Sequence, residues 1–178
     1  MVKPRADSSQ EADNTASAVA QMYAHPGFLL RRAHQIAASL FHQDIDGELT
    51  PPQFSALQLI GLVPGIDQIS VARVIGLDRN TISVVIGNLV KQEWVARRPD
   101  PLDGRRYCLE PTASGRRLLA RLLKRAESSE ARMLSAFNAS EAELFVSLLR
   151  RFVESFNDDS RAPVDNKALE LAQLRRRG

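Results

Sequence analysis

The chain has 178 residues, long enough for one domain with a substantial core, and its 44% hydrophobic and 25% charged residues are ordinary for a soluble globular protein. Its single cysteine, Cys108, excludes an intramolecular disulfide bond and fits a reducing cytoplasm. Residues 1–25 lack the apolar centre of a signal peptide and no run of about 18 apolar residues occurs, so we expect a cytoplasmic protein without a membrane span.

The N-terminal part is predicted to hold a flexible arm and one amphipathic helix. Residues 1–25 are rich in Ser, Ala, Asp and Gln, as in a loose terminal arm. Pro26 stands where helices often start, and apolar residues recur at helical spacing from Phe28 to Gln43. The loop DIDGELTPP then ends the pattern, which places this helix within residues 26–47.

Three helices are predicted in the middle of the chain. Thr50 and Gln53 have the spacing of a capping box at the start of the helix PPQFSALQLIGLV. A short helix, QISVARVIG, ends at Gly76, and after a tight turn Asp78 is a suitable N-cap for a longer helix, RNTISVVIGNLVKQEW. The buried stripe of that helix is formed by Ile82, Val85, Ile86 and Leu89. A short helix, a turn and a second helix make a helix-turn-helix, whose second helix fits a major groove.

A β-hairpin and two long helices are predicted to follow. The segments WVARR and RRYCLE flank the turn PDPLDG, with Trp94 as a core anchor, and the second strand is expected to end before Pro111. Thr112 is the expected N-cap of the next helix, and another capping box is expected at Ser140 and Glu143. The fold class is therefore mainly α with a small β-hairpin wing.

Charge is unevenly distributed over the second half of the chain. Residues 94–125 contain nine basic and three acidic side chains, a net charge of +6, whereas residues 126–160 contain three basic and seven acidic ones, a net charge of −4. A basic block beside an acidic block fits a positively charged face with a polyanionic partner. A solvated helix surface would explain the same counts, and charge alone does not decide between them.

The second helix of the helix-turn-helix has an outer face that suits DNA. In the major groove arginine pairs with guanine, asparagine pairs with adenine, hydroxyl groups bond phosphates or base edges, and valine can contact a thymine methyl. The candidate contacts on this face are Arg79, Asn80, Thr81, Ser83, Val84 and Asn88. The alternative is the ordinary polar face of an amphipathic helix, and the hairpin that follows directly favours DNA binding.

Several ordered motifs resemble those of the MarR family of bacterial transcription regulators. They are LTPPQF at a helix start, GLDRNT entering the recognition helix, RRPDPLDGR in the hairpin and TASG at the next helix start. The similarity runs from about Pro26 to Phe156. It implies a homodimer that binds double-stranded DNA at a palindromic operator, with recognition helices in successive major grooves and each wing in a minor groove. The implied parts are a flexible arm (1–25), a dimerisation helix (26–47), a winged helix-turn-helix DNA-binding domain (48–111), long helices that complete the dimerisation region (112–160) and a basic tail (161–178).

The hairpin has a predicted division of labour. Arg97 and Arg98, on its first strand, are expected near phosphates. The resemblance pairs Asp103 with Arg105, so we predict that Arg105 probes the minor groove, that Asp103 aims it, and that Arg106 supports it at the phosphates.

An effector site is predicted in the first amphipathic helix. Members of the family usually release DNA when a small anion, often an aromatic carboxylate or phenol, enters a cleft between the dimerisation and DNA-binding parts. Arg32 and His34 lie at the edges of the apolar stripe, with Phe41 near His34, and are placed to bind an anion. The segment RRAHQ is similar to regulators of aromatic-acid catabolism, including some that answer to aromatic acyl-CoA thioesters. A partly buried structural histidine and surface salt bridges are the alternatives.

Other functions were weighed against a ligand-responsive repressor. A redox-responsive repressor would use Cys108, whose pKa nearby arginines could lower. A winged helix could also bind another protein instead of DNA. An enzyme is not expected, because His25, His34 and His42 lack metal-ligand spacing and no phosphate loop or nucleophile elbow is present. We therefore expect no cofactor, no metal and no catalytic residue.

Overall fold

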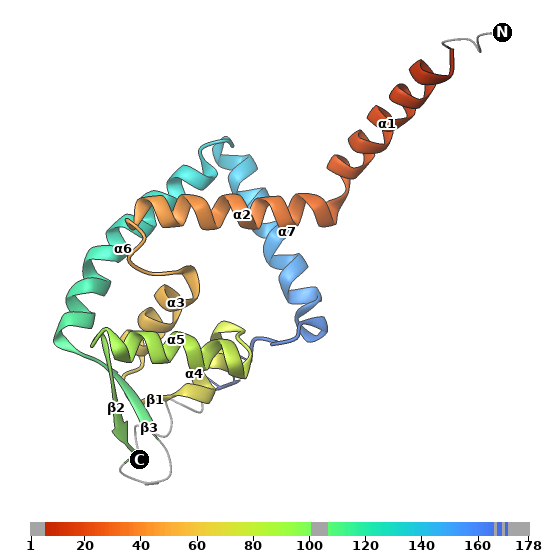
Figure 1. Cartoon of the computed structure of the whole chain (residues 1–178). Coiled ribbons are helices and arrows are strands. Elements are labelled where there is room, and N and C mark those ends of the chain that lie inside the picture. The colour runs from red at the N-terminus through yellow and green to blue at the C-terminus, as the bar shows by residue number, and fades with distance from the viewer. Residues whose placement is uncertain (1–5, 101–106, 166, 169, 171–178) are drawn as a thin grey trace. The chain divides into compact units, whose positions relative to one another are not determined.

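The computed structural model describes residues 6–100, 107–165, 167, 168 and 170, and Figure 1 shows its helices and strands. The chain divides into two compact units, residues 1–40 and residues 41–178. The fold is mainly helical with one small antiparallel sheet, which confirms the predicted class. None of the helices within the described residues has the length and apolar content that crossing a membrane requires.

The first unit holds helix α1 (Ala6–Ala24) and most of α2 (Pro26–Asp44). Helix α1 was not predicted, because the polar composition of residues 1–25 suggested a loose arm. The many alanines of this segment, with Glu and Gln, have high helix propensity. Helix α2 begins at Pro26 as predicted. The rings of Tyr23 and Phe28 lie 5.1 Å apart between centroids, so they pack across the junction of the two helices.

The second unit contains the remaining elements. They are α3 (Pro51–Leu62), β1 (Ile66–Asp67), α4 (Gln68–Ile75), α5 (Arg79–Lys91), β2 (Val95–Pro99), β3 (Tyr107–Pro111), α6 (Ala113–Leu134), α7 (Ala139–Ser155) and a 3-10 turn, η1 (Asn157–Asp159). Its core is built by side chains from α3, α4, α5, the sheet and the first half of α6, with Trp94 packed half-buried against it as predicted. Burial of these apolar side chains holds the three short helices together.

The helix caps show how far local sequence signals reach. The Thr50 hydroxyl accepts from Gln53 N at 3.4 Å and the Gln53 side chain accepts from Thr50 N at 2.8 Å, which confirms that capping box. The N-caps Asp78 and Thr112 are confirmed as well. The predicted capping box at Ser140 and Glu143 was wrong. The box is formed two residues earlier by Asn138 and Glu141, where asparagine is an equally good N-cap.

The sheet has three antiparallel strands in the order β1-β3-β2. Strand β1 was not predicted, because it has only two residues and pairs with a strand more than 40 positions away, Ile66 opposite Leu109. The expectation that β3 ends before Pro111 was wrong, since Pro111 pairs with Val95. Strand β1 does not reach this position, so β3 has a single neighbour there and the missing N–H is tolerated.

Candidate nucleic-acid interface

Helices α4 and α5 form the predicted helix-turn-helix. Helix α4 starts after Asp67, whose side chain accepts from Ile69 N and Ser70 N at 3.0 Å. It ends at Gly76, whose φ of 66° lies in the left-handed region that glycine adopts without strain. The Leu77 N–H then donates to Ala72 O at 2.9 Å, which closes the tight turn before α5. This geometry fixes the direction in which α5 leaves α4.

The start of α5 is held by Asp78. Its Oδ1 accepts from Asn80 N at 2.9 Å and from Thr81 N at 3.0 Å, and its Oδ2 accepts from the Thr81 hydroxyl at 2.6 Å. The Thr81 hydroxyl, followed by the backbone N–H groups, lowers the pKa of Asp78. The first turn of α5 is therefore anchored while its outer side chains stay available.

The outer face of α5 is arranged as predicted. Ile82, Val85, Ile86 and Leu89 are buried, which confirms the core stripe. Of the candidate DNA contacts, Arg79, Asn80, Ser83, Val84 and Asn88 are exposed, and Thr81 is half-buried by its bond to Asp78. Val84 is 63% exposed, which is unusual for a large apolar side chain on a polar face and fits contact with a thymine methyl.

A hollow of about 540 Å³ lies between the start of α3 and the outer face of α5. It is lined by Thr50, Pro52 and Gln53 on one side and by Asn80, Thr81, Val84, Val85 and Asn88 on the other. Thr50 and Gln53 were predicted only as a capping box at the start of α3. No pattern in the sequence indicates that the start of α3 borders α5.

The two arginines predicted on the first wing strand already have partners. Arg97 Nη2 donates to Gln68 Oε1 at 3.0 Å, and Arg98 Nε lies 3.0 Å from Glu110 Oε2 on β3. Both arginines are exposed, so they can also meet a phosphate. Asp103, Arg105 and Arg106 lie outside the described residues.

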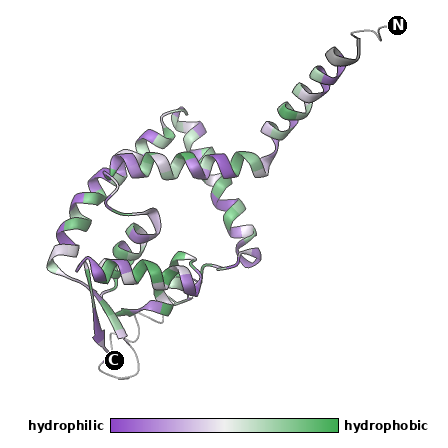
Figure 2. Ribbon diagram, viewed as in Figure 1, coloured by the Kyte–Doolittle hydropathy of each residue, from purple (hydrophilic) through white to green (hydrophobic). Residues whose placement is uncertain are grey.

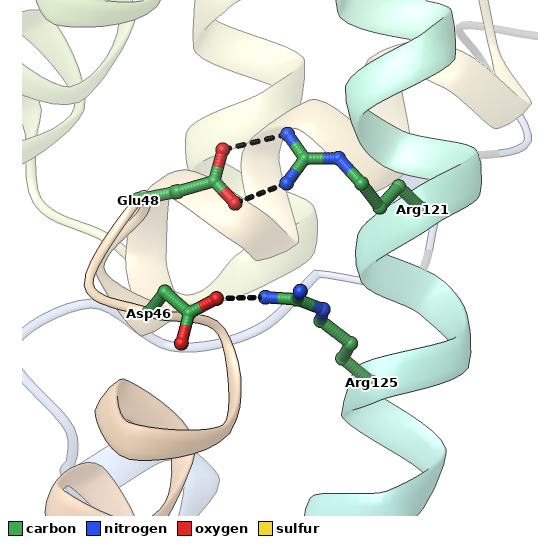
Figure 3. Close-up of polar contacts among 4 residues, drawn as sticks. All are labelled: Asp46, Glu48, Arg121 and Arg125. Carbon is green, nitrogen blue, oxygen red and sulfur yellow. Dashed lines mark hydrogen bonds and ion pairs between the residues drawn. The ribbon is translucent and has the colours of Figure 1, made fainter.

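Three arginines of α6 form ion pairs within the protein, two of them from the basic block 94–125 and one, Arg132, from the acidic block 126–160. Figure 3 shows that Arg121 on α6 binds both carboxylate oxygens of Glu48, at 2.5 and 2.6 Å, and that Arg125 binds Asp46. Arg132 pairs in the same way with Asp44 at 3.1 Å. The Glu48 hydrogen bond raises the pKa of Arg121 further. These arginines hold α6 against the last residue of α2 and the segment that follows it. Neither interpretation of the charge pattern included this role.

The predicted effector residues fall in both units. In the first unit, Arg32 Nη1 donates to Gln35 Oε1 at 3.1 Å and His34 is exposed. In the second unit, Phe41 is half-buried and packs edge-on against Phe54, with 5.4 Å between ring centroids. Phe41 is thus a core contact of its own unit. Within the described part of the chain, no group of His, Cys, Asp and Glu side chains is arranged to hold a metal ion.

Cys108 differs from what the sequence suggested. Burial, together with the charge of Asp100 and a hydrogen bond with it, raises the pKa of the Cys108 thiol, and Asp67 and Glu110 act in the same direction. The expectation that arginines lower this pKa was wrong, because acidic side chains are the charges that act on the thiol. A thiol with a raised pKa is a poor nucleophile at neutral pH, which argues against redox sensing at this position.

A winged helix-turn-helix with an exposed polar recognition helix defines a DNA-binding transcription regulator. Residues 48–106 match the model of the MarR family, and the chain belongs to this family. The family consists of transcription regulators and not of enzymes.

Three related proteins show the extent of the similarity. The HTH-type transcriptional repressor NicR of Pseudomonas putida is 31% identical over 156 residues, which cover 87% of this chain and 97% of NicR. The structure of PcaV from Streptomyces coelicolor with its natural ligand is 34% identical, with a TM-score of 0.70 over 75% of this chain and 94% of PcaV. BpsR of Bordetella bronchiseptica, whose DNA binding is regulated by 6-hydroxynicotinic acid, is 30% identical, with a TM-score of 0.69 over 73% of this chain and 94% of BpsR.

Proposed function

We propose that this protein is a homodimeric repressor that binds a palindromic operator and leaves it when a small aromatic carboxylate binds. The observation that carries the proposal is the outer face of α5, where Asn80, Ser83, Val84 and Asn88 are exposed on a helix anchored by Asp78. A face of this composition on the second helix of a helix-turn-helix suits the edges of base pairs. NicR, a named repressor, supports repression over activation.

A second copy of the chain would cover the apolar face of α7. Figure 2 shows hydrophobic and hydrophilic residues alternating along this helix. Six large apolar side chains of α7 and that of its C-cap residue are between 41% and 58% exposed: Leu144, Phe145, Leu148, Leu149, Phe152, Val153 and, at the C-cap, Phe156. A continuous apolar face of this size marks an interaction surface in a water-soluble protein. Helix α2 also exposes Leu29 and Ile36, each by about half, and we propose that both helices contribute to the dimer.

The wing is the second DNA contact in this proposal. The sequence places Arg105 two residues after Asp103, with Gly104 between them. We propose that Arg105 enters the minor groove, that Asp103 orients it, and that Arg97, Arg98 and Arg106 bind phosphates. Arg105→Ala should then reduce operator affinity by at least about tenfold without dissociating the dimer, and Asp103→Ala should reproduce part of that loss.

The effector is proposed to be an aromatic acid held by Arg32 and His34. Both side chains are exposed, and guanidinium and imidazole N–H groups can donate hydrogen bonds to a carboxylate. The regulation of BpsR by 6-hydroxynicotinic acid supports an aromatic acid over other anions. An aromatic acyl-CoA thioester would present the same ring with a much larger anionic group, so the two effector classes can be separated in a titration.

The test is DNA binding measured by fluorescence anisotropy. The probe is the duplex upstream of the gene for this protein, and the comparison is a scrambled duplex of equal length. We expect tight binding to the upstream duplex that weakens steeply with salt, and release by aromatic acids that is lost in Arg32→Ala with His34→Ala but kept in Arg31→Ala. Equal, salt-insensitive binding to both duplexes would overturn the repressor and favour a protein-interaction module. Unchanged operator binding with every acid and thioester would overturn the effector class alone.

A further inference from the structure

The segment after α7 folds back on the helix-turn-helix. We call its residues 157–165 the C-terminal strap, and in Figure 1 this blue segment turns toward α4. Asn157 closes the strap, because its Nδ2 donates to Val164 O at 3.1 Å and its Oδ1 accepts from Val164 N at 2.8 Å. The Ser160 hydroxyl accepts from Ala162 N at 3.2 Å inside the same loop. The side chains of Asn157 and Ser160 therefore give the strap a defined loop conformation.

The strap is fastened to the turn between α4 and α5. The Asp165 N–H donates to Arg73 O at 2.9 Å, which satisfies a carbonyl in the last turn of α4 that has no partner in the helix. Gly76 lets the strap approach closely, since a Cβ at this position would lie 3.0 Å from Val164 Cγ2 and 3.3 Å from Ala162 O. These contacts place the strap beside the N-terminal end of the recognition helix.

A hollow of about 370 Å³ lies where the strap meets α4 and α5. Its charged lining consists of Arg73, Arg79, Arg161, Asp78 and Asp165. The three guanidinium groups make no hydrogen bond or ion pair with another described side chain. Of the two carboxylates, Asp78 caps α5, and Asp165 Oδ1 accepts from Lys167 N at 3.0 Å. Three arginines against two carboxylates give the lining a net charge of 3 − 2 = +1, and the three guanidinium groups keep their donors for a ligand.

We propose that this hollow binds a phosphate group of the DNA backbone beside the major groove that α5 enters. Arg161 of the strap then extends the DNA interface beyond the winged helix. The proposal rests on the proposed DNA binding, because Arg79 belongs to both sites. Guanidinium groups bind phosphate oxygens through paired hydrogen bonds, and three of them line this hollow. A backbone phosphate is favoured over a free anion because the nearest turn of α5 is the part of a recognition helix that reaches DNA.

The test compares Arg161→Ala with Lys167→Ala in salt titrations of DNA binding. Lys167 is exposed just beyond the strap and does not line the hollow. The substitution Lys167→Ala therefore removes the same charge as Arg161→Ala without changing the hollow. A phosphate contact carries no sequence information, so Arg161→Ala should lower affinity for the upstream duplex and for a scrambled duplex by a similar factor. The slope of log affinity against log salt should fall by about one for each hollow, and Lys167→Ala should keep the parental slope.

The outcomes separate this inference from the proposed function. Sequence-specific binding by the parent with an unchanged slope in Arg161→Ala would overturn the phosphate site and leave the repressor intact. Equal losses in both variants would show a general charge effect of the C-terminal segment and would also overturn the site. The last experiment is calorimetry with inorganic phosphate. If Arg161→Ala removes saturable phosphate binding but leaves the slope of log DNA affinity against log salt unchanged, the hollow binds a free anion instead of DNA.

Discussion

The carboxylate of Asp78 binds Thr81 twice, through its backbone N–H at 3.0 Å and its hydroxyl at 2.6 Å. Thr81 is a candidate DNA contact, yet its hydroxyl is used to anchor the helix that presents its neighbours. The same carboxylate accepts from Asn80 N at 2.9 Å. The start of α5 is thus organised by a single acidic side chain, although the proposed partner of that helix is a polyanion.

The first prediction concerns this cap. Asp78→Ala leaves two N–H groups and the Thr81 hydroxyl without their acceptor, so we expect the melting temperature to fall by about 2–4 °C and operator affinity to fall with it. Asp78→Asn is the matched control, because asparagine keeps the side-chain oxygen that accepts from the N–H groups but not the charge, so it should lose less than alanine. Melting curves and anisotropy titrations check both variants. An alanine variant that melts with the parent would show that packing alone positions α5.

The second prediction is a pH dependence. The folded-state pKa of Asp78 lies below its ordinary value of 3.8, because the Thr81 hydroxyl and backbone N–H groups bind the charged form. The unfolded chain therefore takes up the proton first, so the carboxylate's contribution is fully present above pH 3.8 and is lost as the pH falls through the folded-state value. Urea denaturation of parent and Asp78→Asn should show a constant difference from neutral pH to about pH 5 and a shrinking one below it. A difference that does not change down to pH 3 would contradict this account.

Local signals and distant contacts differ in what the sequence reveals. The caps at Thr50 and Asp78 were predictable because donor and acceptor lie within three residues of each other. The Arg121 pair with Glu48 spans 73 positions, and strand β1 pairs with a strand more than 40 positions away, so neither leaves a local pattern. The exposed polar face of α5 was predictable from helical spacing alone. The strap was not, because it reaches α4 through a fold-back of the chain that no periodicity encodes.

A third prediction tests the joint between the wing and α6. A Cβ on Gly115 would lie 2.0 Å from the backbone oxygen of Trp94, so Gly115→Ala requires the backbone itself to move. We expect a loss of at least about 3 kcal/mol in the free energy of unfolding. The matched control is Gly87→Ala, which meets no atom within 4 Å and should stabilise α5 by about 0.5–1 kcal/mol. Urea denaturation of both variants decides, and equal small effects would show that α6 can shift away from Trp94.

The fourth prediction concerns Cys108. Burial and Asp100 raise the pKa of this thiol, so little thiolate is present at neutral pH. We expect iodoacetamide to modify Cys108 more slowly than it modifies glutathione, and the rate to rise as the pH is raised. Asp100→Asn should speed the reaction, because it removes the charge that opposes the thiolate. Peroxide should leave operator binding unchanged in the parent and in Cys108→Ser. Fast alkylation at neutral pH would restore the redox alternative.

The last prediction follows from the pairing of Arg98 with Glu110 across the wing. The pair is solvent-exposed, so it contributes little to folding, but it ties up a wing arginine that we propose as a phosphate contact. Glu110→Gln frees the Arg98 guanidinium and removes a charge that repels DNA. We therefore expect operator affinity to rise about threefold, with a steeper salt dependence and an unchanged melting temperature. Glu127→Gln, an exposed carboxylate on α6, makes the same change in net charge and should have a smaller effect. If both variants gain equally, net charge and not the wing arginine sets the affinity.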